Sequence, residues 1–383
     1  MRIAIFSDTF VPEVNGVART LKRYTDYLEE QGIEYQLFVP NSQDAIPEVP
    51  HVQRFTSIPF FLYSECRLAF AKPNDIKQKL IDFQPDLIHI ATPFNLGLLG
   101  SYYGKKLNIP IVASYHTHFD HYLQYYHLSF LKNWIWKYMS WFHRPFKKVF
   151  VPSKSTKEKL ISRNFHPNID IWGRGVNHHF YTPKKRTDTI RAKYSIKEKN
   201  ILLFVGRLAP EKNISMVMDT YHNLPESIKK ETHLLIVGDG PLYKSLMKEK
   251  TAHMTLTGFL DGEALAEVYA SSDLFLFPSN TETFGNVVLE AMASGLPVIG
   301  AKEGGVKNLI ADKENGYLCR PNDLQDFVNK TTRLIEDESL RNQMAHHARL
   351  FALTQSWDAI FNDLILACQD VIYEEDRVEK YPA

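Results

Sequence analysis

Arg207 and Lys212 have the residue types and the spacing to grip a diphosphate group. Both follow the apolar run ILLFV, residues 201–205, which is closed by Gly206. A glycine at the end of a strand lets the backbone approach a ligand closely. A guanidinium can hold two phosphate oxygens at once, and an ammonium adds a compact positive charge. The segment FVGRLAPEKN therefore predicts a diphosphate-binding loop, and a surface loop with two solvated cations is the alternative.

Two carboxylates, Glu282 and Glu290, lie in the segment PSNTETFGNVVLEAMASGLPVIG, residues 278–300. Glu282 falls in a polar loop, and Glu290 falls in an apolar stretch that predicts a buried helix beginning near Gly285 and Asn286. The N-terminus of a helix offers N–H groups and the positive end of its dipole to phosphate. A buried carboxylate is costly without a partner. A ribose diol would be such a partner for Glu290, and a structural hydrogen bond to a neighbouring loop is the alternative.

Short apolar runs bounded by turn residues predict the strands that must position these side chains. The runs are Arg2–Ser7, Tyr35–Pro40, Asp86–Ala91, Ile109–Tyr115, Lys148–Pro152, Ile169–Trp172, Ile201–Gly206, His233–Gly238, Met254–Gly258, Leu274–Pro278 and Pro297–Gly300. Because they do not alternate strictly between apolar and polar residues, they predict strands buried on both faces, as in a parallel sheet. Amphipathic stretches at Val17–Gln31, Ile214–Leu224 and Gly262–Ala270 predict helices between them. The predicted fold class is therefore α/β, built from βαβ units.

The series of strands and helices begins twice. Residues 173–198 are polar and rich in turn residues, and they predict a linker that leads into a second series. We expect two Rossmann-like domains, residues 1–172 and 173–356, with the C-terminal helix of residues 357–383 packing back on the first. Two such domains facing a cleft would direct the carboxyl ends of both sheets toward it, and ligands of open α/β sheets bind at those ends.

The block from Glu282 to Glu290 carries a resemblance to a known family. Together with VGRLAPEKN and LLIVGDGP upstream, it resembles the retaining glycosyltransferases of family 4, which have the GT-B fold and use nucleotide-sugar donors. The similarity runs from IFSDTFVPEVNGV to PNDLQDF and so covers most of the chain. It implies that Arg207 and Lys212 hold the donor diphosphate, that Glu290 takes the ribose hydroxyls, and that Glu282 contacts hydroxyls of the transferred sugar.

The resemblance also implies close contacts between the donor and the backbone. Backbone N–H groups of Phe284, Gly285 and Asn286 would contact the phosphate and the sugar. The segment Thr257–Gly258–Phe259 would line the base pocket, and Gly16, on the loop after the first strand, would approach the diphosphate. Asn177 follows Arg174–Gly175–Val176 where many relatives carry Asp, and we assign that position no role.

A run of histidines follows the predicted strand Ile109–Tyr115. His116 matches a family histidine near the transferred sugar, which implies a catalytic role beside Glu282, and a histidine without a role is the alternative. His118 and His121 raise the alternative of a metal site. The chain contains no Asp-x-Asp, however, and cations with helix N–H groups could stabilise the leaving diphosphate. We therefore expect no metal and no cofactor, since the nucleotide sugar is a co-substrate.

The stretch 119–148 combines aromatic and basic residues. Residues 100–175 hold 12 Lys or Arg against 3 Asp or Glu, although the whole chain has a net charge of only +1. Aromatic and cationic side chains on one helix are typical of contact with an anionic membrane. The residues predicted at the membrane are Lys132, Trp134, Trp136, Lys137, Trp141, Arg144, Lys147 and Lys148. An aromatic core beneath exposed lysines and a nucleic-acid stacking surface are the alternatives.

Composition restricts the remaining classes of function. The near-neutral net charge disfavours a general nucleic-acid binder. Three widely spaced cysteines indicate free thiols in a reducing compartment. The N-terminus reads as a buried strand rather than a signal peptide, and no apolar run approaches the 18 residues of a membrane span. These features predict a cytoplasmic protein, peripheral on the inner face of the cell membrane.

The function that these features predict is transfer of a hexose, with retained configuration, from a nucleotide sugar such as GDP-mannose or a UDP-hexose. The acceptor would be a membrane lipid such as diacylglycerol or a glycolipid, and a soluble or cell-wall polysaccharide is the alternative. A sugar-nucleotide epimerase would leave the aromatic, basic stretch without a purpose. A nicotinamide oxidoreductase would need G-x-G-x-x-G after the first strand, where the loop DTFVPEVNGV has a single glycine.

Overall fold

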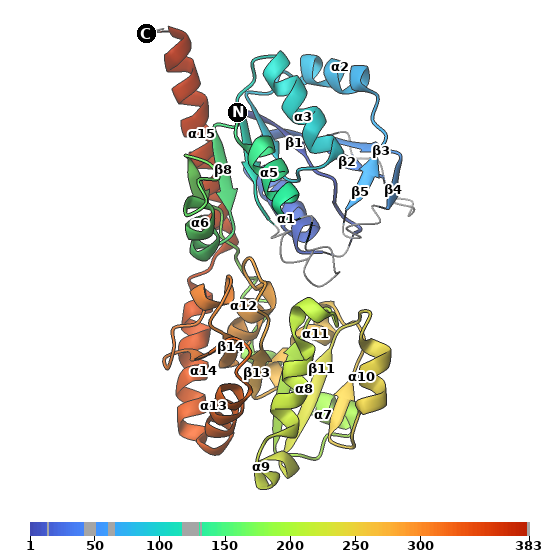
Figure 1. Ribbon diagram of the computed structural model, residues 1–383, viewed down its shortest axis with the longest axis vertical. Coiled ribbons are helices and arrows are strands. Elements are labelled where there is room, and N and C mark those ends of the chain that lie inside the picture. Colours follow the sequence, from blue (N-terminus) through green and yellow to red (C-terminus); the bar gives the residue numbers. More distant parts are fainter. Residues whose placement is uncertain (14, 42–50, 60–65, 117–129, 131, 381–383) are drawn as a thin grey trace. The chain divides into compact units, whose positions relative to one another are not determined.

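The computed structural model describes the chain except residues 14, 42–50, 60–65, 117–129, 131 and 381–383 (Figure 1). The described residues form two compact units. The first unit contains residues from 1–117, 130–173 and 358–383, and the second contains residues 174–357. Each unit is an α/β layer structure built on its own parallel sheet, as the sequence predicted.

The first unit is built on a seven-stranded parallel sheet with the strand order β3-β2-β1-β6-β7-β8-β9. Its strands are β1 (Arg2–Phe6), β2 (Glu34–Pro40), β3 (Val52–Phe55), β6 (Leu87–Ile90), β7 (Ile111–Ser114), β8 (Lys148–Val151) and β9 (Ile169–Ile171), with a separate antiparallel hairpin of β4 (Ser57–Pro59) and β5 (Arg67–Ala69). Its helices are α1 (Gly16–Glu30), α2 (Pro73–Phe83), α3 (Asn95–Lys106), α5 (Lys132–His143), α6 (Lys154–Ile161) and α15 (Trp357–Lys380). The strand order reverses between β1 and β6, which makes the carboxyl ends of these two strands the switch point of the sheet.

Helices α1 and α15 meet through an aromatic cluster in the core of the first unit. Leu21, Tyr24 and Leu28 lie on one face of α1 at helical spacing and are fully buried. The ring of Phe361 from α15 lies 5.5 Å from the ring of Tyr24. The buried Trp172, which follows β9, contacts both of these rings. This cluster fixes the end of the chain on the first unit, because its large apolar rings are removed from water together.

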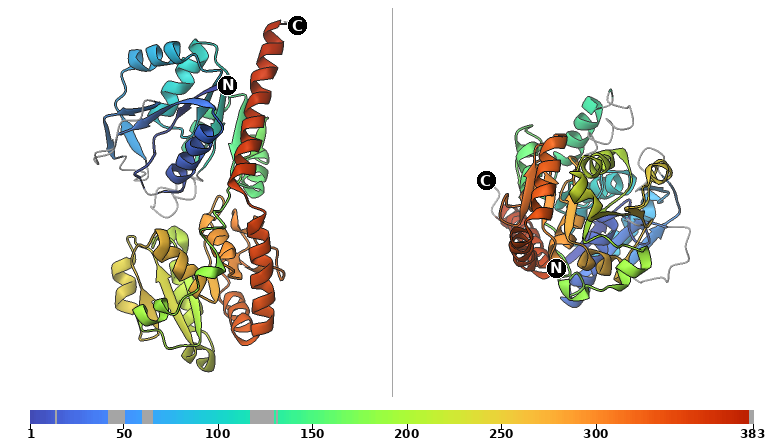
Figure 2. Two further views of the ribbon diagram at one scale, coloured as in Figure 1. Left: turned by 180° about the vertical axis from the view of Figure 1, so that it is seen from behind. Right: turned by 90° about the horizontal axis from the view of Figure 1, so that it is seen from below.

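The second unit is built on a six-stranded parallel sheet with the strand order β12-β11-β10-β13-β14-β15. Its strands are β10 (Asn200–Val205), β11 (Thr232–Val237), β12 (Met254–Leu256), β13 (Leu274–Phe277), β14 (Val298–Ala301) and β15 (Gly316–Cys319). Its helices are α7 (Thr189–Tyr194), α8 (Ile214–His222), α9 (Glu226–Lys230), α10 (Tyr243–Glu249), α11 (Gly262–Ser271), α12 (Asn286–Ala293), α13 (Leu324–Glu336) and α14 (Glu338–Leu353), with short 3₁₀ turns η2 (Pro183–Lys185), η3 (Pro210–Lys212) and η4 (Val306–Asn308). The helices lie on both faces of the sheet (Figure 2). The order is that of a doubly wound fold, with its switch point between β10 and β13.

Each strand predicted from the sequence lies within two residues of an observed strand at both ends. The sequence prediction missed β3, β4, β5 and β15. The strands β3, β4 and β5 are short and only partly buried, so they lack a fully apolar run, whereas β15 is apolar and largely buried but only four residues long. The predicted helix at Val17–Gln31 begins one residue earlier, at Gly16, because the Asn15 side chain accepts a hydrogen bond from the N–H of Ala18 and caps the helix there.

The segment 173–198, predicted as the linker and entry to the second domain, contributes side chains to the core of the second unit. Val176, Tyr181, Ile190 and Ile196 are buried in the core of the second unit. The segment also contains η2 and α7. Its apolar residues are too widely spaced to show a period, and each fills a separate place in the core, which is why the pattern concealed them.

Candidate active site

Three loops at the carboxyl ends of β10, β11 and β12 are joined directly through their backbones. The N–H of Leu208 donates to the carbonyl of Asp239 at 2.9 Å, and the N–H of Gly238 donates to the carbonyl of Gly258 at 2.9 Å. A Cβ atom on Gly238 would lie 1.9 Å from the carbonyl oxygen of Gly206, so no larger residue fits there. The segments VGR, GDG and TGF, far apart in the sequence, therefore form one surface of the second unit.

Arg207 and Lys212 both contact carboxylates at this end of the sheet. The Nζ atom of Lys212 lies 2.5 Å from Oε1 of Glu282, and both side chains are largely buried. The Nη1 atom of Arg207 lies 3.9 Å from Oε1 of Glu211, a carboxylate that is only 1% exposed. The loop after β10 and the loop after β13 thus meet at the switch point, and three of the predicted donor residues share one site.

The helix α12 begins where the sequence predicted. Gly285 precedes it with φ of +104°, a conformation that a residue with a Cβ atom rarely adopts, and Asn286 is its first residue. The half-buried Glu290 accepts a hydrogen bond at 3.2 Å from the hydroxyl of Tyr269 in α11. Glu290 therefore has a structural partner, but this partner comes from a neighbouring helix rather than from a loop.

A glycine pair that the sequence analysis overlooked supports the loop of Glu282. The N–H of Gly305 donates to the carbonyl of Glu282 at 2.7 Å. A Cβ atom on Gly305 would lie 2.4 Å from the carbonyl oxygen of Thr283, and one on Gly304 would lie 2.6 Å from that of Glu282. Two consecutive glycines shortly after β14 were the feature of the sequence that could have identified this support. They allow backbone to pack against backbone behind the loop of Glu282 and Phe284.

The segment proposed for the base pocket has an open surface. Gly258 has φ of +76°, and a Cβ atom there would meet nothing within 4 Å. The side chain of Phe259 is 53% exposed. Backbone conformation rather than crowding therefore favours glycine at position 258. The exposed ring of Phe259 provides an apolar surface beside Gly258.

In the first unit, Gly16 lies at the N-terminus of α1 rather than on the preceding loop. Asn15 orients this end, since its Nδ2 donates to Oγ1 of Thr9 at 2.8 Å and its Oδ1 accepts from the N–H of Ala18 at 2.9 Å. Gly16 itself is exposed. The first turn of a 15-residue helix, with its positive dipole end, is thus presented without a side chain at position 16.

His116 lies just after β7 and is half-buried. Its ring packs edge-on against the buried Trp172, with the ring centroids 5.3 Å apart. This contact fixes the plane of the imidazole near the carboxyl end of the sheet in the first unit. His118 and His121 lie outside the described residues.

A buried carboxylate at the switch point of the first unit was absent from the sequence-based candidates. Asp8, two residues after β1, is fully buried, and its carboxylate accepts hydrogen bonds from the N–H of Leu96 at 2.9 Å and from Oγ1 of Thr92 at 2.7 Å. Burial raises the pKa of Asp8 to about 6, against the lowering effect of these hydrogen bonds. The position of Asp8, two residues after the buried run RIAIF, was the feature of the sequence that could have identified it. Asp8 ties the ends of β1 and β6 together.

The exposed face of α5 is aromatic and basic. Trp134 and Trp141 are 65% and 64% exposed, and Phe130 just before the helix is 77% exposed. The spacing of seven residues places the two tryptophans on one face, with the exposed Lys137 between them. Arg144 is exposed just after the helix. Lys132, at the first position of α5, is half-buried.

Trp136, Lys147 and Lys148 lie apart from this face. The ring of Trp136 packs against Phe165, and the guanidinium of Arg163 lies 4.1 Å from its centroid. Lys147 pairs with Glu375 at 2.6 Å, and Lys148 in β8 lies 3.8 Å from Asp170. These three side chains are therefore held by packing or ion pairs within the first unit, and they do not belong to the exposed face of α5.

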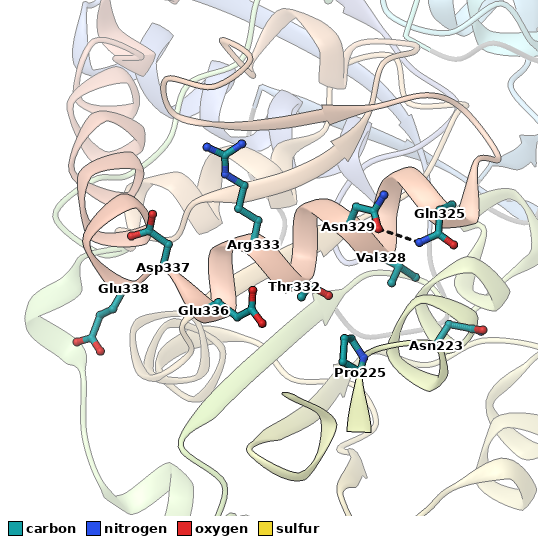
Figure 3. Close-up of a pocket in the computed structure, with 10 residues that line it drawn as sticks. All are labelled: Asn223, Pro225, Gln325, Val328, Asn329, Thr332, Arg333, Glu336, Asp337 and Glu338. Carbon is teal, nitrogen blue, oxygen red and sulfur yellow. Dashed lines mark hydrogen bonds between the residues drawn. The ribbon is translucent and has the colours of Figure 1, made fainter. Parts of the chain in front are cut away.

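A pocket of about 620 Å³ lies elsewhere on the second unit (Figure 3). It runs beside α13, with Asn223 and Pro225 opposite that helix. Glu336, Asp337 and Glu338 line one end of it. Its walls come from helices and their connections rather than from the carboxyl ends of strands, and its three acids against the single cation Arg333 would repel an anionic donor. It is therefore not the candidate donor site.

Within the described ranges, no group of three or more His, Cys, Asp or Glu side chains is arranged to hold a metal ion. None of the helices in that part of the chain combines the length and the apolar character needed to cross a bilayer.

Comparisons with known proteins agree with this architecture. The model of "Glycosyltransferase Family 4" matches residues 14–180, and that of "Glycosyl transferases group 1" matches residues 186–351. The chain is 32% identical to a GDP-mannose-dependent alpha-mannosyltransferase of Corynebacterium glutamicum, over 99% of this chain and 91% of that protein. It is 30% identical to an alpha-monoglucosyldiacylglycerol synthase of Streptococcus pneumoniae, over 83% of this chain and 75% of that protein.

Among solved structures, the sucrose-phosphate synthase of Thermosynechococcus elongatus superposes with a TM-score of 0.79 at 20% identity, covering 98% of this chain and 100% of that one. This likeness shows the fold. Together, the two family models and the relatives favour a transferase over the epimerase and oxidoreductase alternatives. The chain belongs to glycosyltransferase family 4 and is a glycosyltransferase of the GT-B fold.

Proposed function

We propose that this enzyme transfers a hexose from GDP-mannose or a UDP-hexose to a hydroxyl group of a membrane lipid, with retention of the anomeric configuration. The names of the two relatives support this class of reaction, since one uses GDP-mannose and the other makes a glucosyl lipid. Diacylglycerol and glycolipids are the acceptors that we favour. The enzyme would act as a peripheral protein on the inner face of the cell membrane.

The residues around the switch point of the second unit suit a nucleotide-sugar donor. Arg207 and Lys212 supply two positive charges for a diphosphate, and the N-terminus of α12 adds backbone N–H groups. Glu290 would accept protons from the ribose diol, and Glu282 would hold hydroxyls of the transferred hexose. Positive groups placed where the diphosphate leaves would stabilise the developing charge, which is usually a large part of catalysis.

Retention fits an attack by the acceptor on the face from which the diphosphate departs. No carboxylate of the first unit lies at a position that the family pattern marks as a nucleophile, so a covalent glycosyl-enzyme step is not part of this proposal. His116 would hydrogen-bond a hydroxyl of the transferred sugar and orient it. No metal and no further cofactor is required by this scheme.

The main support for a lipid acceptor is the exposed aromatic face of α5. Trp134 and Trp141 are largely exposed in one line along the helix, beside Lys137 and close to Arg144. Exposed apolar rings are costly in water, and tryptophan is favoured at the interface between lipid headgroups and acyl chains. Each basic residue near an anionic surface adds about 1 kcal/mol of attraction. A soluble polysaccharide acceptor would give the exposed tryptophans and the basic residues of this face no binding role.

The proposal is tested by following nucleotide release and lipid products by mass spectrometry. Purified enzyme would be incubated with GDP-mannose, UDP-glucose, UDP-galactose or UDP-N-acetylglucosamine, with and without vesicles that contain diacylglycerol. A hexosyl-lipid formed from one donor would establish donor and acceptor class together. Nucleotide release without a lipid product in any vesicle would refute the lipid acceptor and favour a soluble or polymeric one.

The membrane surface is tested separately by vesicle co-sedimentation. Replacing Trp134 and Trp141 by Ser should release the enzyme from phosphatidylglycerol vesicles. A matched control replaces Tyr102 and Tyr373, which are 55% and 66% exposed on other helices of the first unit. If the folded wild type does not bind these vesicles, or if both double variants bind equally, the membrane face is wrong.

A further inference from the structure

Tyr138 connects the exposed aromatic face of α5 to the interior of the first unit. Its ring stacks on Trp134, with the centroids 6.0 Å apart and the planes within 8°, and lies 5.9 Å from the ring of Trp141. Tyr138 is half-buried between these two exposed side chains. Its hydroxyl donates a hydrogen bond to the carbonyl of Pro93. One side chain thus contacts both the face proposed for the membrane and a loop of the sheet.

Pro93 belongs to the loop that joins β6 to α3 at the switch point. In that loop, Oγ1 of Thr92 donates to Oδ2 of Asp8 at 2.7 Å and accepts from the N–H of Asp8 at 2.6 Å. The other carboxylate oxygen of Asp8 accepts from the N–H of Leu96 at 2.9 Å, at the start of α3. Four buried polar groups are therefore bonded to one another, which fixes the ends of β1 and β6 together.

The backbone links this group of hydrogen bonds to a second one at the N-terminus of α1. Thr9 follows Asp8 in the chain, and its Oγ1 accepts from Nδ2 of Asn15 at 2.8 Å. Asn15 in turn caps α1 beside Gly16, the glycine proposed to approach the donor diphosphate. Burial and the charge of Asp8 raise the pKa of Tyr138 to about 12, so its hydroxyl keeps the proton that it donates. All of these groups lie within the first unit.

We propose that Tyr138 is a positioning residue, which transmits membrane contact at Trp134 and Trp141 to the loops at the carboxyl ends of β1 and β6. The proposal rests on the membrane surface of the proposed function and adds regulation to it. Anchoring of α5 in the headgroup region restricts the motion of the Tyr138 side chain. The hydrogen bond from Tyr138 to Pro93 then restricts the motion of the loop that is bonded to Asp8. A membrane can favour one arrangement of these loops only if it contacts that arrangement better, and α5 provides the differential contact.

The test compares Tyr138→Phe with wild type in two measurements made on the same vesicles. Phenylalanine keeps the stacked ring and removes only the hydroxyl. Co-sedimentation with phosphatidylglycerol vesicles should be unchanged, and nucleotide release without vesicles should stay within about twofold. The stimulation of nucleotide release by vesicles should fall at least about fivefold, a typical size for coupling between two sites. Tyr102→Phe is the matched control, since the Tyr102 hydroxyl accepts a hydrogen bond from the exposed Lys106 on the same helix.

A second variant, Thr92→Val, removes the next link without changing the aromatic face. If both variants interrupt one series, the loss in the double variant should be smaller than the product of the two single losses. Full stimulation of Tyr138→Phe, or a wild type that binds vesicles without being stimulated, would overturn the coupling and leave the membrane surface standing. Loss of vesicle binding by Tyr138→Phe would also overturn it. A wild type that never binds vesicles would refute the membrane surface and this inference together.

Discussion

Lys212 and Glu282 form an ion pair, with 2.5 Å between Nζ and Oε1, although they are 70 positions apart in the sequence. Lys212 ends the 3₁₀ turn after β10, and Glu282 lies in the loop after β13. The pair therefore spans the switch point of the second unit. A donor diphosphate would compete with Glu282 for the ammonium, so donor binding would exchange one anionic partner of Lys212 for another and release the carboxylate toward sugar hydroxyls.

Lys212→Ala should lower kcat/KM for the donor by roughly 10- to 100-fold, the range expected for one charge-assisted hydrogen bond. Steady-state kinetics with the active donor from the panel would measure this. Lys229→Ala is the matched control, because Lys229 also pairs with a glutamate but lies on the surface of the same unit. Unchanged kinetics in the Lys212 variant would remove its role at the diphosphate.

Glu290→Ala should weaken binding of GDP or UDP by about 10-fold or more, because the ribose hydroxyls lose a charged acceptor. Isothermal titration with each nucleotide measures the change. Tyr269→Phe removes the hydroxyl that donates to Glu290 and keeps the carboxylate, so it should have a smaller effect. If Tyr269→Phe weakens binding as much as Glu290→Ala, or if neither variant does, a direct ribose contact by Glu290 is contradicted.

His116→Ala should lower kcat while nucleotide affinity and melting temperature change little. The half-buried ring contacts Trp172 on one side, so its removal costs less packing than the loss of a fully buried residue. Kinetics and thermal unfolding are measured on the same preparation, with the exposed His346→Ala as control. A fall in melting temperature with wild-type turnover would make His116 a structural residue.

Gly305→Ala should reduce both stability and donor affinity, because its Cβ atom would lie 2.4 to 2.5 Å from backbone atoms of Thr283 and Phe284. Backbone atoms cannot rotate away, so the loop of Glu282 must shift. We expect a loss of about 1 to 3 kcal/mol in the free energy of unfolding. Gly173→Ala is the control, since its Cβ atom would have only a side-chain atom of Ile360 at 4.0 Å. Equal stability of the two variants in urea would contradict the close packing.

Asp8 should make the first unit less stable as the pH rises from about 4 to 6. Its folded pKa of about 6 exceeds the ordinary value of 3.8, so between these values the folded chain binds more protons than the unfolded chain. Stability then falls with rising pH, by up to about 3 kcal/mol for this group. His89 acts in the opposite direction, since burial lowers its pKa to about 3 and acid favours the unfolded state.

Urea unfolding of wild type and Asp8→Asn between pH 4 and 7 separates the two groups. The variant lacks the Asp8 contribution, so its stability should rise more steeply with pH than that of the wild type, with the contribution of His89 retained. Parallel pH profiles for the two proteins would show that Asp8 does not titrate in this range.

The sequence alone determined the α/β architecture and the position of the loops proposed to bind the donor, directly after buried strands. Buried strands such as β10 and β11 consist of consecutive apolar residues, and this pattern is local, so it can be read without the fold. The residues at the start of α12 could also be predicted, because glycine at position 285 and the apolar residues that follow it determine helix entry and burial locally. The short strands β3 and β15 were missed because too few of their residues carry a periodic signal.

Tertiary structure decided which side chains meet. Lys212 reaches Glu282, and the Tyr269 hydroxyl reaches Glu290, only because sheet order brings distant loops and helices together. Trp136 and Trp141 look alike in the sequence, yet one packs under Arg163 and the other is 64% exposed. Asp8 and Tyr138 could be recognised as candidate positioning residues only from their burial and hydrogen bonds in the folded unit. A helix exposes one face and buries another, and its packing partners decide which residue lies on which.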